Sequence, residues 1–408
     1  MNDAGVYPNR RSQSHAPETG TQLGLALLAY LLGITLIVTL LPFRFAWPEA
    51  WRLVFYVGPA DVFANILLFL PLGFLYRYAR PQAHAHPVAA AMGAGALLSF
   101  GIEALQLFEA ARNASPVDVA ANAAGAALGA FAYGRLAGSP RIDGRVVGWL
   151  ALELPIMGLV YLLVPLLWVS ALAAHGELAR SVMTLTVGVF GAVLLGGMQR
   201  YYFGPARAAR PRHTAIFAGI WFIAGAFPAL AWQPLLIAAG ALAIAGLCGA
   251  LGSVRSAAHV SNRRFEVRLI AYAAPLYVFY LAAVTLAPLI GGTGDWTVRR
   301  GFGEAASDQI EILRLLELIA AYTLIGYMAA EARGRAIARY REALPGLVLC
   351  GVVLVALCEL VRGYAQSDGA SAARGALLML GVLYGGWLYY LQRAHVIRLI
   401  AGTHPRGR

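Results

Sequence analysis

The chain is poor in charged residues. Only 13% of its 408 residues are charged, and 60% are hydrophobic, whereas a soluble domain carries about 25% charged residues. The mean hydropathy is +0.66. This composition excludes an ordinary soluble domain and predicts an all-α polytopic membrane protein, because helices satisfy their own backbone hydrogen bonds in lipid.

Cysteine is scarce, and the common cofactor motifs are missing. Cys248, Cys350 and Cys358 all fall in apolar segments, where cysteines are typically small core residues. No P-loop, nucleotide fingerprint, haem motif or zinc signature occurs, which disfavours an ATP-driven pump. His84 and His86 have no further ligand nearby, and closed metal sites need three or four ligands. We therefore expect no metal and no other cofactor.

Lysine is absent, so all 32 basic residues are arginine. If the N-terminus is cytoplasmic, 23 arginines lie on the cytoplasmic side of the predicted spans and 9 on the other side. The positive-inside rule then places both termini in the cytoplasm. Anionic lipid headgroups and this asymmetry account for the net charge of +12, so we expect membrane lipids and no nucleic acid as partners.

Twelve apolar segments are long enough to span a bilayer, which takes about 17–25 residues. They lie at 24–42, 61–78, 88–109, 118–137, 149–171, 182–200, 213–231, 234–252, 270–290, 312–331, 345–364 and 375–393. The seventh and eighth are nearly continuous and are also compatible with a re-entrant hairpin. We expect a 4+4+4 arrangement. Its parts are a disordered cytoplasmic tail at 1–22, four-helix regions at 23–138, 149–252 and 268–394, and a cytoplasmic tail at 395–408.

Polar residues interrupt the second to fourth segments. An ionised carboxylate costs roughly 2.5–3.5 kcal/mol at the centre of a membrane helix, so several of them need a reason. Their i, i+3 and i, i+4 spacings place them on single helix faces near the outer leaflet. We expect these faces to converge, either as a binding site or as a polar clasp that fixes helix packing. The candidate site is Asp61, Asn65, Glu103, Gln106, Arg112, Asp118 and Asn122.

The chemistry of such a site is open. An excess of carboxylates suits a cation, a cationic group or shared protons. No nucleophile stands out, because Ser99 and Ser115 are typical of ordinary helix and capping residues. We therefore assign no catalytic residue, and we favour a protein that is not an enzyme.

Small residues and a proline indicate how the second and fourth segments pack. Gly125 and Gly129 form a small-xxx-small stripe that permits close helix contact. Pro71 and Gly73 loosen the second segment near its middle. We expect these four residues to be structural.

The order and spacing of these motifs resemble the VanZ-like family over residues 24–137. The motifs are N-I-L-L-F-L-P-L-G-F, S-F-G-I-E-A-L-Q-L-F and R-x5-D-x3-N-x2-G-x3-G. The resemblance implies a small helical module of the bacterial cell envelope, in the cytoplasmic membrane, linked to low-level antibiotic resistance against teicoplanin-type glycopeptides. The family positions fall on Asn65, Pro71, Gly73, Glu103, Gln106, Arg112, Asp118 and Asn122.

The last four segments resemble a degenerate repeat of the first four. Val38–Pro42 matches Val284–Pro288, Gly73 aligns with Gly326, and Glu103 aligns with Glu359. Gly125 and Gly129 align with Gly381 and Gly385. We expect a parallel internal repeat, because equivalent helices of the two copies are eight positions apart, and an even offset makes both copies face the same way.

The polar positions of the second copy differ in charge. Asp61, Gln106 and Asp118 align with Arg314, Arg362 and Arg374, and Asn122 aligns with Leu378. We expect the second-copy cluster to be a self-neutralising group of ion pairs or a site for an anionic headgroup. Its residues are Arg314, Glu317, Glu359, Arg362 and Arg374. The first cluster would then be the functional one.

The outer loop at 43–60 interleaves aromatic residues with Arg44 and Arg52. Such a pattern is typical of an interfacial helix or of an aromatic belt that anchors the neighbouring spans.

The leading expectation is a VanZ-like integral membrane protein. It would engage an envelope lipid, a lipid-linked precursor or a lipophilic glycopeptide at the outer leaflet. One alternative is a secondary transporter or flippase coupled to protons or cations. The other is a non-catalytic membrane scaffold, in which the polar residues only stabilise the bundle.

Overall fold

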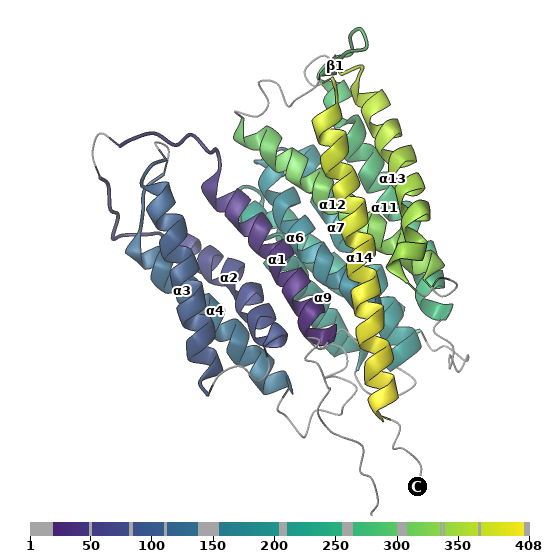
Figure 1. Ribbon diagram of the computed structural model, residues 1–408, viewed down its shortest axis with the longest axis horizontal. Helices are drawn as coiled ribbons and strands as arrows, with labels where there is room; N and C mark the ends of the chain where they lie inside the picture. The colour runs from purple at the N-terminus through teal and green to yellow at the C-terminus, as the bar shows by residue number, and fades with distance from the viewer. Residues whose placement is uncertain are drawn as a thin grey trace, which may run out of the picture.

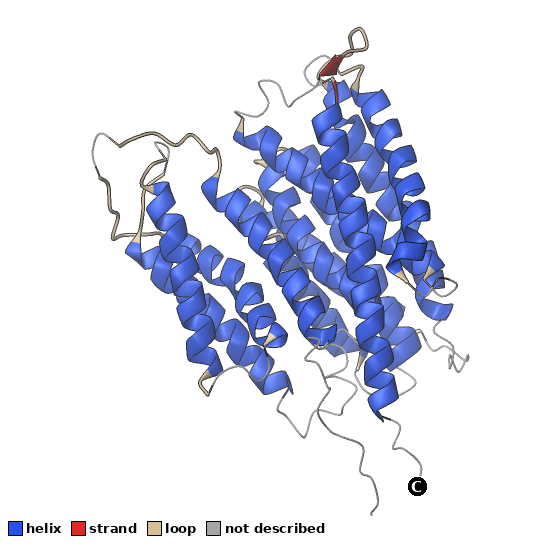
Figure 2. Ribbon diagram, viewed as in Figure 1, coloured by secondary structure: helices blue, strands red, loops and turns tan. Residues whose placement is uncertain are grey.

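The computed structural model describes residues 19–48, 51–80, 85–109, 112–137, 155–203, 210–254, 264–299, 308–334, 337, 339–365 and 369–403. Helices dominate this part of the chain, and its strands are a two-residue parallel pair, β1 (Val298–Arg299) with β2 (Ala370–Ser371) (Figure 2). The all-α fold predicted from composition is confirmed.

The first helices are α1 (Thr19–Leu40), α2 (Pro59–Ala79), α3 (Pro87–Gln106) and α4 (Pro116–Ala137). The middle region holds α6 (Pro155–Ala174), α7 (Leu178–Met198), the π-helix η1 (Gln199–Phe203), α9 (Pro211–Gly225), the 3-10 helix η2 (Phe227–Ala231) and α10 (Pro234–Ser253). The last helices are α11 (Arg264–Ile290), α12 (Gln309–Arg333), α13 (Tyr340–Arg362) and α14 (Ala372–Thr403).

Proline sets the first residue of many of these helices. Its fixed φ suits the first turn, and its missing N–H is not needed there. The helices that begin with proline are α2, α3, α4, α6, α9 and α10.

Among the described residues, nine helices are long and apolar enough to cross a membrane, namely α1, α2, α3, α6, α7, α10, α11, α12 and α13. The chain is therefore a multi-pass membrane protein. Helices α4, α9 and α14 fall outside this set. The 15 residues of α9 rise only about 22 Å, short of the roughly 30 Å hydrocarbon core. Twelve full spans thus remain a prediction.

Several predicted boundaries are wrong. Helix α1 begins at Thr19, so residues 19–22 are helical and not part of a tail. Helix α14 continues to Thr403, so residues 395–403 are helical as well. Helix α3 ends at Gln106 instead of at residue 109, because the following backbone bonds to an outer loop: the Ala46 N–H donates to the Phe108 carbonyl at 2.7 Å. Residues 1–18, 81–84, 138–154 and 404–408 lie outside the described part.

The core is centred on α6. The apolar stretch of α6 is 78% buried, the largest share among the nine candidate spans. Helix α6 contacts α7 and α12. The bundle of α2, α3 and α4 lies to one side, and α1 separates it from α14 (Figure 1). The Tyr384 hydroxyl of α14 donates to the Ala26 carbonyl of α1 at 2.7 Å. The start of α1 and the end of α14 lie at the same end of the molecule, where Gly20 adjoins His395.

The aromatic loop, which we define as the described residues between α1 and α2, is at the opposite end (Figure 1). It contains no helix in residues 43–48 and 51–58, so the interfacial helix is not formed. Bridges to the chain after α3 hold it extended instead, joining Phe45 to Glu109 and Leu53 to Ala114. Trp47 and Tyr56 are 80% and 84% exposed.

Candidate functional site

Glycines set the distance between α2 and α4. A Cβ atom on Gly125 or Gly129 would overlap the carbonyl oxygens of Ile66 and Leu70, and one on Gly73 would overlap the carbonyl oxygen of Ala126. The two backbones therefore touch, as small-residue stripes permit. Helix α2 stays helical through Pro71. This close packing brings the polar first turns of α2 and α4 together.

Two amide side chains join the helices of this bundle. The Asn65 Nδ2 of α2 donates to the Asp118 Oδ1 of α4 at 2.8 Å. The Asn122 Nδ2 of α4 donates to the Ser99 Oγ of α3 at 2.8 Å. The Asn122 residue is only 4% exposed, so this second bond lies inside the bundle.

The Glu103 carboxylate lies at the centre of the group. Residue Glu103 is 8% exposed, and its Oε2 accepts the backbone N–H of Ser115 at 2.7 Å. The charges of Asp118 and Arg112 both act on it, and the charge of Asp61 acts on Asp118. Asp118 therefore lies within electrostatic range of both Glu103 and Asp61, so that three helices contribute carboxylates to one group.

The remaining predicted residues are placed differently. Asp61 is exposed and makes no side-chain hydrogen bond within the described residues. The Gln106 Nε2 donates to the Thr39 carbonyl at 2.8 Å, and the Arg112 Nε donates to the Leu41 carbonyl at 3.3 Å. Gln106 and Arg112 thus attach the bundle to the end of α1, and the Arg112 guanidinium forms no ion pair with a carboxylate in the described chain.

Glu109 is buried in an unexpected way. It follows α3 in the bridge with Phe45 and is only 2% exposed. Neither carboxylate oxygen has a hydrogen-bond partner among the described residues. The predicted segment 88–109 has Glu109 as its last residue, but the structure places this residue after the helix, in the bridge with the aromatic loop.

In the second-copy cluster, Glu359 repeats the backbone contact of Glu103. Its Oε2 accepts the Ser371 N–H at 2.6 Å. Arg374 also binds this carboxylate in a bidentate manner, from Nε to Oε1 and from Nη2 to Oε2, both at 2.7 Å. The Arg362 Nη2 donates to the Val284 carbonyl at 3.4 Å, so Arg362 bonds to α11.

Glu317 has partners that the sequence did not predict. Its Oε2 lies 3.2 Å from the Arg180 Nη1 of α7, and its Oε1 accepts the Tyr280 hydroxyl of α11 at 2.9 Å. Arg314 instead pairs with Glu311 and, at 3.2 Å, with Glu177. The second-copy residues thus contact the middle region as well as one another: Glu359 pairs with Arg374, whereas Glu317 pairs with Arg180, on which the charge of Arg362 also acts.

One signal could have found Arg180. It stands two residues before the predicted segment 182–200, and helix α7 begins at Leu178, directly after Glu177. If the predicted segment had begun at residue 178 instead of 182, Arg180 would have been placed in the first turn of this helix and not in an outer loop. Nothing in the pattern singles out Tyr280 among the aromatic residues of α11. Across the described residues, no three His, Cys, Asp or Glu side chains gather as metal ligands would.

Comparison with known families assigns the N-terminal third. A family model described as VanZ/LLP1 matches residues 9–137, a range that includes α1 to α4. The resemblance predicted from the motifs is confirmed for this third of the chain. No curated protein and no solved structure matches the chain.

Proposed function

We propose that the α1–α4 bundle is a VanZ-like module that binds an envelope lipid, a lipid-linked precursor or a lipophilic glycopeptide at the outer leaflet. The similarity of residues 9–137 to VanZ/LLP1 supports the module. The observation that carries the binding role is the meeting of Asp61, Glu103 and Asp118 at the end of the bundle that also holds the aromatic loop.

The carboxylates and the aromatic loop suit different parts of one ligand. Carboxylates that repel one another gain most from a cationic group, because it removes the repulsion and restores the lost solvation. The exposed rings of Trp47, Trp51 and Tyr56 offer apolar area at the depth where aromatic residues meet headgroups. A lipophilic molecule with a positive group matches both.

We also propose that residues 268–394 repeat residues 23–138. The contacts of equivalent residues support this. Gly73 faces the Ala126 carbonyl as Gly326 faces that of Val382, and the offsets, 253 for the glycines and 256 for the carbonyls, are those of the sequence alignment. The bridge between Leu53 and Ala114 corresponds to the β1–β2 pairing of Val298 with Ala370.

This correspondence favours the first copy as the functional one. Asp118 accepts a hydrogen bond from a neutral amide, whereas Glu359 forms a bidentate ion pair with Arg374. An internally neutralised carboxylate has little affinity left for a cationic ligand. The first copy keeps its negative charge available.

We place the chain in the cytoplasmic membrane of a bacterium with both termini in the cytoplasm. The excess of arginine at one end supports the cytoplasmic orientation, and the position of the start of α1 and the end of α14 at a common end supports termini on the same side. Labelling of single cysteines introduced at Ala46 and Thr403 by a membrane-impermeant thiol reagent tests it. Only the cysteine at Ala46 should react in intact cells.

The test of function is teicoplanin susceptibility of one host with and without the gene. We expect protection by the wild type and its loss in Glu103→Gln. The matched control is the double variant Glu359→Gln with Arg374→Gln, which removes the second-copy pair and should still protect. Protection that survives Glu103→Gln but disappears in the control would reverse the assignment.

Substitution of Asp61 distinguishes a binding role of the module from a scaffold role. Because this carboxylate is exposed and forms no hydrogen bond in the described chain, Asp61→Asn should leave stability unchanged within about 0.5 kcal/mol. A scaffold then predicts unchanged activity, whereas our proposal predicts weaker protection at equal expression and melting temperature.

A secondary transporter or flippase is the competing function, favoured by the matching contacts of the two bundles. Reconstitution in vesicles tests it, with proton-dependent uptake and lipid scrambling as readouts. Transport that depends on the proton gradient and stops in Glu103→Gln would support this alternative over simple binding.

A further inference from the structure

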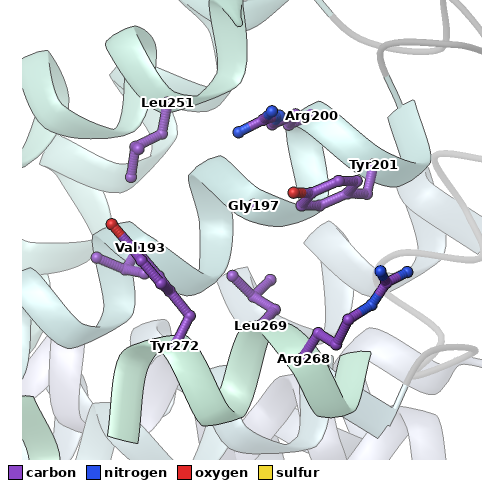
Figure 3. A pocket seen from close by; sticks show the side chains of 8 residues that line it. All are labelled: Val193, Gly197, Arg200, Tyr201, Leu251, Arg268, Leu269 and Tyr272. Carbon is purple, nitrogen blue, oxygen red and sulfur yellow. The ribbon is translucent and has the colours of Figure 1, made fainter. Parts of the chain in front are cut away.

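A cavity outside the VanZ-like module is lined by both apolar residues and arginine. Its volume is about 340 Å³, within the range of roughly 300–1,000 Å³ typical of ligand sites. It lies where η1 continues α7 and where α10 and α11 come close (Figure 3). The lining residues are Val193, Gly197, Arg200, Tyr201, Leu251, Arg268, Leu269 and Tyr272.

The cavity has a positive side made by two guanidinium groups. Arg200 lies over the ring of Tyr201, with its Cζ 5.1 Å from the ring centroid. Its Nε is buried and has no hydrogen-bond partner within the described residues. Arg268 of α11 is exposed. Neither arginine forms an ion pair in the described chain.

No carboxylate of the described residues lines this cavity. Glu266 is close in sequence to Arg268, but it is only 1% exposed and its charge acts on Tyr327 of α12. The two positive charges of Arg200 and Arg268 are therefore available to an anion. A buried guanidinium N–H without an acceptor destabilises the protein. A phosphate oxygen that accepts a hydrogen bond from this group would remove the cost.

The local backbone contributes to this arrangement. Helix α7 changes to a π-helix over Gln199–Phe203, and π turns often occur at functional sites because they redirect side chains. In Figure 3 the Arg200 side chain extends between Leu251 and Tyr201, and Arg268 stands on the neighbouring helix below Tyr201.

The other walls of the cavity are apolar and include an exposed side chain. Val193, Leu251 and Leu269 line the cavity, and Tyr272 at its edge is 72% exposed. Arg268 is in the second turn of α11, and Leu251 is in the last turn of α10. The cavity therefore lies at the ends of helices that are long enough to span, where a headgroup and the first part of an acyl chain meet the protein.

We propose that this cavity binds an anionic phospholipid of the leaflet on the side of the termini. Arg200 and Arg268 would hold the phosphate, and Val193, Leu251 and Leu269 would contact the first methylenes of one acyl chain. Basic pockets between membrane helices bind anionic headgroups in this way. The second, independent part of the argument is the buried Arg200 Nε, a donor whose acceptor is missing from the described chain.

The test measures binding of dioleoyl phosphatidylglycerol to the full chain in detergent micelles by native mass spectrometry. Arg200→Gln with Arg268→Gln should weaken binding roughly 30-fold, because each arginine near an anionic headgroup contributes about 1 kcal/mol. Arg77→Gln with Arg80→Gln is the matched control, since it removes two arginines at the same end of the molecule. Equal loss in both double variants would refute a specific site.

A second variant keeps the charges and fills the space. Leu251→Trp should weaken binding of the lipid and leave Arg200 and Arg268 intact. Arg200→Lys with Arg268→Lys should bind within a few-fold of the wild type, which shows that the arginines act through charge and not through folding.

Three further probes distinguish the source of the anion. Dioleoyl phosphatidylcholine should bind much more weakly than phosphatidylglycerol, and inorganic phosphate and glycerol phosphate should not compete at millimolar concentration. Competition by inorganic phosphate would make this a site for a soluble anion. Equal binding of phosphatidylcholine would make it an apolar groove. Either result overturns the proposal.

Discussion

Substitution of glycine by alanine should have opposite effects on stability at Gly129 and at Gly134 of helix α4. Alanine is favoured over glycine in a helix interior by about 1 kcal/mol, so both substitutions start with the same gain. A Cβ on Gly134 meets nothing within 4 Å. We therefore expect Gly134→Ala to stabilise the protein by about 0.5–1 kcal/mol.

At Gly129 the new Cβ would overlap the Leu70 carbonyl oxygen and the Phe74 amide nitrogen. Both are backbone atoms of α2, so no side-chain rotation relieves the overlap and α4 must move away from α2. A gap of 0.5–1 Å removes about a quarter to a half of each van der Waals contact, and overpacking costs about 1–3 kcal/mol. Taking the upper value and subtracting the helix gain leaves Gly129→Ala destabilised by about 2 kcal/mol.

The assay is equilibrium unfolding in mixed micelles of dodecyl maltoside and sodium dodecyl sulfate, followed by tryptophan fluorescence. The two variants should shift the midpoint in opposite directions from the wild type. If Gly129→Ala is as stable as Gly134→Ala, the backbones of α2 and α4 are not in contact at this position, and the close packing inferred for the site is wrong.

Three other predictions follow from buried polar contacts. Glu317→Gln should cost about 3–5 kcal/mol because it leaves the Arg180 charge buried, whereas Arg180→Met with Glu317→Met should cost much less in the same unfolding assay. Tyr280→Phe removes one hydrogen bond to a charged group and should cost about 1.5–3 kcal/mol, measured in the same way; no loss would mean that water replaces the hydroxyl. Asn122→Leu with Ser99→Val replaces both partners of one bond and should be nearly neutral in thermal stability, whereas Asn122→Leu alone should be destabilising.

Much of the candidate site could be predicted because hydrocarbon penalises charge. Asp61, Glu103 and Asp118 stand out in apolar segments, and their spacing fixes the helix face that carries each one. The glycine spacing on α4 likewise indicated close packing against another helix. These features depend on local sequence, which the helix period converts directly into geometry.

What could not be predicted depends on partners distant in the sequence. The ion pair of Glu317 joins it to Arg180, 137 residues away, and no local pattern encodes that choice. Glu109 was misplaced because the end of α3 is decided by backbone pairing with Phe45 and Ala46. The aromatic loop was left open between a helix and a belt for the same reason, since its conformation depends on the chain after α3.

The stacking of Tyr30 on Tyr384 and the bond from Tyr384 to Ala26 also bear on stoichiometry. Separate bundles in a membrane would meet only as often as their abundance allows. Here α1 and α14 belong to one polypeptide, so the VanZ-like bundle and the C-terminal bundle are made in equal number and stay adjacent at any expression level. Even in a cell that produces few copies of this chain, every N-terminal bundle remains packed against a C-terminal bundle.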